Sequence, residues 1–99
     1  MLNINQTVEE GKAVIALEGR LDTLTASDLE KVVHEDLTDV TEVTLDMKDL
    51  EYIASAGLRV ILEMYKLMLK RDGLKIRNVG PVVMSIFETT GFVDVMDIE

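Results

Sequence analysis

The sequence predicts a small α/β domain, built from a mixed β-sheet with helices mainly on one face. Strand-like segments alternate along the chain with amphipathic helical segments, an order typical of parallel strands joined by right-handed crossovers. Within each predicted strand apolar and polar residues also alternate, which indicates a sheet with one buried and one exposed face. The chain has 99 residues, so we expect a single domain over residues 1–99.

The first two predicted strands form an antiparallel pair. Apolar and polar side chains alternate over residues 2–8 and again over residues 13–18. Between them lies a turn in which Gly11 can adopt a positive φ. Residues 19–23 are expected to form the loop that leaves the second strand.

A helix, a short strand and an acidic loop are expected next. Thr25 and Asp28 have the spacing of a capping box, and apolar residues follow at helical spacing: Ala26, Leu29, Val33 and Leu37. Val43 and Leu45 then predict a short strand that ends near Asp46. We expect residues 49–54 to form a loop in front of the next helix.

The longest predicted helix follows Ser55. Its main apolar face is expected to consist of Leu58, Ile61, Leu62, Tyr65, Met68 and Leu69, widened by Val60, Met64 and Leu67. Gly73 is the expected C-cap, and residues 74–77 form the next strand. Pro81 and Gly91 should begin and end a third helix, with a short strand or turn after it. The polar face of the sheet should carry Thr44, Lys75 and Arg77.

The composition argues against several classes of function. The net charge is −9, from 19 acidic and 10 basic residues, which disfavours nucleic acid or an anionic membrane as a partner. The chain has no cysteine and a single histidine, His34, which we expect to be solvated, so no metal site is predicted. No signal peptide or membrane-spanning stretch is evident, and the expected location is the cytoplasm.

No catalytic motif or cofactor-binding motif is present, so we expect a protein without a cofactor that is not an enzyme. Asp22 and Asp46 offer one alternative, because both follow predicted strands. Two carboxylates at the same edge of a parallel sheet can hold Mg²⁺ or accept a phosphoryl group, as in a response-regulator receiver. That alternative would make Asp46 the phosphoacceptor.

Ser55 lies at or beside the start of the longest predicted helix. The free backbone N–H groups and the helix dipole favour a negative group at such a position. The serine can therefore be a helix cap or a site of phosphorylation, and the two alternatives imply different functions.

The segment Ile53–Arg59, reading IASAGLR, resembles the motif that opens the long helix of STAS domains, in particular of bacterial anti-sigma factor antagonists. The segment Gly19–Asp22 and the turn Thr90–Phe92 resemble other parts of the same family, so the similarity extends over nearly the whole chain. The chain differs from many members at Ala54, where they have aspartate, and at Ala56, where they have a second serine.

The resemblance implies a regulatory switch. Family members bind an anti-sigma factor that is also a serine kinase, and phosphorylation of the motif serine, here Ser55, ends the interaction. Asp22, Ala54, Ala56 and Gly57 are then expected beside Ser55 in the partner-binding surface. The partners expected are the kinase and a phosphatase, and the protein itself should be a monomer or a weak dimer. A STAS module without a switch, serving as a scaffold or ligand-binding part, is the remaining alternative.

Overall fold

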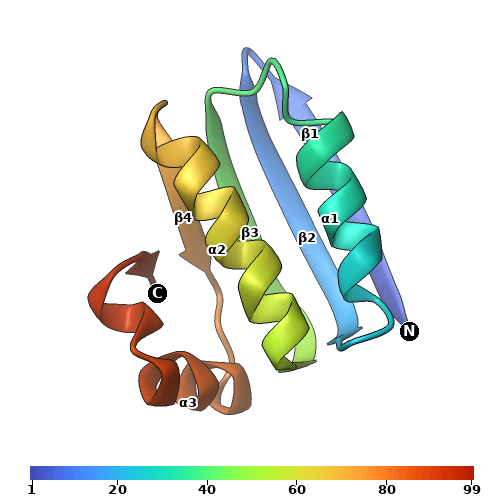
Figure 1. Ribbon diagram of the computed structural model, residues 1–99, viewed down its shortest axis with the longest axis vertical. Coiled ribbons are helices and arrows are strands. Elements are labelled where there is room, and N and C mark those ends of the chain that lie inside the picture. The colour runs from blue at the N-terminus through green and yellow to red at the C-terminus, as the bar shows by residue number, and fades with distance from the viewer.

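The computed structural model describes residues 1–99 and contains a five-stranded sheet, three α-helices and a short 3-10 helix (Figure 1). In chain order the elements are β1 (Leu2–Glu9), β2 (Lys12–Leu21), α1 (Ala26–Glu35), β3 (Glu42–Ile53), α2 (Ser55–Leu69), β4 (Gly73–Arg77), α3 (Pro81–Thr90), η1 (Phe92–Asp94) and β5 (Asp97–Ile98). The predicted order of strands and helices is correct. No helix is both long enough and apolar enough to span a membrane.

The strands lie side by side in the order in which they occur along the chain. β1 and β2 are antiparallel, and the remaining neighbours are parallel. The crossovers from β2 to β3 and from β3 to β4 both advance by one strand in the same direction. Two crossovers that have the same handedness and advance in the same direction place their helices on the same face of the sheet. Figure 1 shows α1 and α2 together on that face, with α3 beyond the end of β4, so the predicted one-sided mixed sheet is confirmed.

β3 is much longer than predicted, because it continues through the segment that we expected to be an acidic loop. Ala16 of β2 pairs with Asp46 of β3. The next pair is Glu18 with Asp49, so β3 has one more residue than β2 over this stretch, and a second such shift follows. These bulges change the spacing of inward-facing residues and hide the strand pattern in the sequence. β2 likewise extends to Leu21, where we expected a loop.

The helix ends agree only in part with the predicted caps. Thr25 is the N-cap residue of α1, but its side chain makes no capping hydrogen bond, so the predicted capping box with Asp28 is wrong. Gly73 is the first residue of β4 and not the C-cap of α2. Pro81 begins α3 and Gly91 ends it with a φ of 81°, as predicted.

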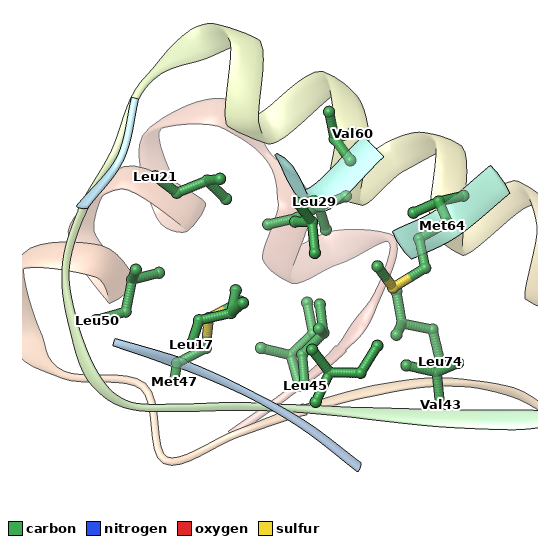
Figure 2. Packing of buried hydrophobic residues seen from close by; sticks show 14 of the residues in the cluster. Leu17, Leu21, Leu29, Val43, Leu45, Met47, Leu50, Val60, Met64 and Leu74 are labelled. Carbon is green, nitrogen blue, oxygen red and sulfur yellow. The ribbon is translucent and has the colours of Figure 1, made fainter. Parts of the chain in front are cut away.

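The core lies between the inner face of the sheet and the helices. It is one cluster of 24 buried apolar residues drawn from strands and helices alike. Figure 2 shows Val60 and Met64 of α2 above the sheet residues Val43, Leu45 and Leu74. Because a single layer of helices covers a single face, α2 supplies much of the cover for the central strand.

The buried face of α2 is rotated relative to the face that we predicted. Its buried residues are Gly57, Val60, Ile61, Met64 and Met68. Leu58 and Leu62 are only partly buried, and Leu69 is exposed. The apolar stripe of this helix is so wide that periodicity alone does not determine which part of it faces the sheet.

The opposite face of the sheet is polar, as predicted, although its central side chains are half-buried by their neighbours. Lys75 Nζ lies 3.3 Å from Glu42 Oε1. The guanidinium of Arg77 binds the carboxylate of Asp97 through two hydrogen bonds of 3.1 Å. This pairing lowers the pKa of Asp97 and raises that of Arg77. Side chains thus link neighbouring strands on the face that no helix covers.

Candidate functional site

The candidate site lies at the edge where β2 and β3 end and where α1 and α2 begin (Figure 1). Leu21 and Ile53, the last residues of the two strands, are paired. Beyond this pair the Ala54 N–H donates a hydrogen bond of 2.8 Å to the Leu21 carbonyl oxygen. Asp22 follows Leu21 directly and Ser55 comes two residues after Ile53, so the fold brings these two predicted site residues to the same edge.

Ser55 is exposed and is the first residue of α2. The N-cap residue is Ala54, whose methyl side chain cannot accept a hydrogen bond, and no side chain caps the helix. The alternative in which Ser55 serves as the cap is therefore wrong. At the start of the helix the Leu58 N–H donates a backbone hydrogen bond of 3.0 Å to the carbonyl oxygen of Ala54. The N–H groups of the first turn ahead of Leu58 are left to bind an added negative group.

Asp22 closes the turn between β2 and α1. Its Oδ1 accepts hydrogen bonds of 3.0 Å from the N–H groups of both Leu24 and Thr25. The Thr25 hydroxyl lies 3.1 Å from the same oxygen and accepts a 2.9 Å bond from the Asp22 N–H. These bonds, led by the one from the Thr25 N–H, hold the pKa of the Asp22 carboxyl below its usual value. Much of the bonding capacity of this carboxylate is therefore used inside the turn.

Gly57 allows α2 to start directly against the end of β2. A Cβ at this position would lie 2.5 Å from Cγ of Leu21, a side chain that is fully buried. Gly57 is itself buried, whereas Ala54 and Ala56 are half-buried. The structure thus explains this glycine by packing, and the expected partner contacts of Ala54, Ala56 and Gly57 remain predictions.

Asp46 does not lie at the end of a strand. It lies within β3, which continues to Ile53, and its Oδ1 accepts hydrogen bonds from the Lys48 N–H at 3.0 Å and from Asn78 Nδ2 at 3.1 Å. Its side chain supports the bulge in β3 and the turn after β4. Since Asp22 and Asp46 do not share an edge of the sheet, the receiver-like alternative loses the arrangement on which it was based.

His34 is exposed, as expected, but it also links the two helices on the covered face. Its Nε2 lies 3.2 Å from Glu63 Oε2 of α2. The ligand atoms of Glu30, His34 and Glu63 all lie within 4.8 Å of one another. Glu63 is two helical turns from Ser55, roughly 12 Å along α2. This group is therefore separate from the edge that carries Ser55.

Arg20 and Tyr52 form a contact beside the site that we did not predict. The guanidinium carbon of Arg20 lies 4.6 Å from the centre of the Tyr52 ring, and the two residues are paired between β2 and β3. The pairing depends on the register shifts in β3, so the sequence gives no direct signal for it. A cationic group and an aromatic ring thus flank the strand end that leads to Ser55.

Comparison with known proteins identifies the family. The family model for the STAS domain matches residues 3–99. The chain belongs to the STAS domain family. The anti-sigma-B factor antagonist of Bacillus subtilis (strain 168) is 31% identical to this STAS domain in an alignment of 104 positions that covers 98% of this chain and 92% of that protein. The predicted family resemblance is confirmed.

Solved structures support the same fold for this STAS domain. The crystal structure of an anti-sigma factor antagonist from Mycobacterium paratuberculosis matches with a TM-score of 0.89 and 21% identity, covering 99% of this chain and 85% of that one. The phosphorylated form of SpoIIAA, a cell fate determinant of Bacillus, matches with a TM-score of 0.66 and 18% identity, covering 100% and 91% of the two chains. At these identities the likeness concerns the fold alone.

Proposed function

We propose that this STAS domain is an anti-sigma factor antagonist, a regulatory binding protein and not an enzyme. It binds an anti-sigma factor that is also a serine kinase, and so releases a sigma factor for transcription in the cytoplasm. The observation that carries this proposal is the exposed Ser55 at the uncapped start of α2, in a chain whose Bacillus subtilis relative is named an anti-sigma-B factor antagonist.

Phosphorylation of Ser55 is the proposed switch. The added group carries roughly −1.5 to −2 charges at neutral pH. Within this protein it meets free N–H groups and the positive end of the α2 dipole, and the first turn of α2 contains no acidic residue. The fold therefore accommodates the phosphate. In a partly desolvated interface with a kinase, the same phosphate faces the catalytic carboxylate of the kinase and the phosphates of its bound nucleotide. The repulsion between these like charges costs several kcal/mol.

A phosphatase completes the proposed cycle, because it returns Ser55 to the form that binds. We propose that the protein acts as a monomer or a weak dimer, and that Asp22, Ala54, Ala56 and Gly57 lie in or beside the surface used. Many anti-sigma factor antagonists that share this motif have an aspartate where this chain has Ala54. The recognition of Ser55 by its kinase therefore relies on other groups at this edge.

Phosphorylation assays on single variants test the proposal. The anti-sigma factor kinases of the source organism are purified one at a time and incubated with ATP and the parent protein, and the modified residue is located by mass spectrometry. Ser55→Ala should abolish the modification. Ser85→Ala is the control, because Ser85 is also an exposed serine in a helix but lies in the middle of α3, and this variant should be modified like the parent. Full phosphorylation of Ser55→Ala would mean that the switch lies at another residue, whereas a parent protein that no kinase modifies would favour a STAS module without a switch.

A further inference from the structure

The turn between β2 and α1 presents one large apolar side chain to the solvent. Leu24 is 85% exposed, more than any other large apolar residue apart from the N-terminal Met1. A leucine in this state contributes nothing to the core. An exposed leucine gains free energy when another surface covers it, so Leu24 can contribute to the binding of a partner.

The backbone of this turn is held by hydrogen bonds on each side of Leu24. The Leu24 and Thr25 N–H groups both donate to Asp22 Oδ1, and the Thr25 hydroxyl lies 2.8 Å from the Arg20 carbonyl oxygen. The Ser27 hydroxyl donates to the Leu24 carbonyl oxygen at 3.3 Å. A partner that covers Leu24 therefore does not have to order the chain that carries it, which reduces the entropic cost of binding.

The turn lies at the same edge as Ser55. It begins one residue after Leu21, whose carbonyl oxygen accepts the hydrogen bond from the N–H of Ala54, the residue before Ser55. Figure 1 shows this turn at the same end of the sheet as the start of α2. A partner that contacts Ser55 thus reaches Leu24 without leaving this edge of the molecule. The chain as a whole carries a net charge of −9, which attracts a partner whose surface around the contact is basic.

We infer that Leu24 is an apolar anchor for the anti-sigma factor, inserted into an apolar pocket that basic side chains border. In this arrangement Asp22 is a positioning residue, because its carboxylate holds the turn that presents Leu24. The inference rests on the proposed function, since it concerns the same partner and the same edge. It adds a contact that does not depend on Ser55 and its phosphate.

Titration calorimetry with the purified anti-sigma factor kinases of the source organism tests the anchor. Leu24→Ala should weaken binding at least about tenfold, because it removes three carbon atoms from a buried contact. Its thermal midpoint should stay that of the parent, because the side chain is exposed. Leu69→Ala is the matched control: Leu69 is a 64% exposed leucine at the other end of α2, and its truncation should leave binding within about twofold.

Two variants of Asp22 separate positioning from direct contact. In Asp22→Asn the amide oxygen can still accept the bonds from Leu24 and Thr25, so the turn should be retained and binding should fall less than in Asp22→Ala. Asp22→Ala loses these bonds and should bind as weakly as Leu24→Ala, with shifted amide resonances of Leu24 and Thr25. Equal losses for the two Asp22 variants would overturn the positioning role.

The outcomes also separate this inference from the proposed function. If a kinase binds the parent and phosphorylates Ser55, but binds Leu24→Ala with parental affinity, the anchor is overturned and the proposed function stands. If none of the kinases binds the parent, the proposed function is overturned and the anchor with it.

Discussion

At the scale of single residues, Asp22 shows how local bonding sets the charge state of a site residue. Its pKa is lowered mainly by the hydrogen bond from the Thr25 N–H, with the Thr25 hydroxyl and the Leu24 N–H also contributing. We predict a carboxyl titration midpoint below the ordinary aspartate value by ¹³C NMR, and a higher midpoint in Thr25→Ala, which loses the hydroxyl. A carboxyl whose folded pKa is lowered stabilises the fold above its ordinary pKa. That contribution is lost as the pH falls through the lowered value. An Asp22 midpoint at or above the ordinary value would show that these bonds are absent in solution.

Gly57 gives a second prediction at this scale. A methyl group on this residue would collide with the buried side chain of Leu21, so Gly57→Ala should lower the free energy of unfolding by roughly 1–3 kcal/mol. Gly80→Ala is the control, because a Cβ there has no neighbour within 4 Å, and it should cost less than about 1 kcal/mol. Urea denaturation measures both values, and equal losses would show that Gly57 has no special packing role.

At the scale of elements, α2 both covers the sheet and positions Ser55. Ile61 is completely buried, whereas Leu58 is partly exposed. Ile61→Ala should therefore cost about 2–5 kcal/mol in free energy of unfolding, and Leu58→Ala distinctly less. Denaturant melts of the two variants test this difference. A larger loss for Leu58→Ala would mean that α2 faces the sheet as the sequence alone predicted.

The elements also show which parts of the fold the sequence can predict. Alternation of strand and helix patterns correctly predicts the mixed, one-sided sheet, because each pattern reflects a regular geometry. The prediction fails in β3, where bulges after Asp46 replace the period of two by wider steps to Leu50 and Ile53. It also misplaces Asp46 at a strand end for the same reason. Register shifts depend on the neighbouring strand, which a local pattern does not contain.

At the scale of the whole molecule, the candidate site is the edge of a one-sided sheet in a strongly acidic protein. The position of Ser55 and Asp22 at one edge could be predicted through the family resemblance, since both lie in recognisable motifs. The exposure of Leu24 and the contact between Arg20 and Tyr52 could not, because they follow from the three-dimensional turn and the strand register. The fold thus assembles a wider surface around Ser55 than the motif alone indicates.

The net charge gives a prediction at this scale. If a basic partner surface meets this chain of charge −9, the association rate should fall several-fold between about 50 and 300 mM NaCl, while the dissociation rate changes little. Stopped-flow association with the anti-sigma factor measures both rates. An association rate independent of salt would mean that the acidity of the chain serves solubility and not attraction of the partner.

The most direct measurement compares the affinity of two forms of the intact protein for the anti-sigma factor kinase: unmodified, and carrying phosphoserine at position 55. Calorimetry should show at least about 100-fold weaker binding of the phosphorylated form, because like charges in the interface cost several kcal/mol. Amide NMR shifts of that form should be confined to residues 52–60 and the neighbouring Asp22. Equal affinities of the two forms would contradict the proposed switch at Ser55.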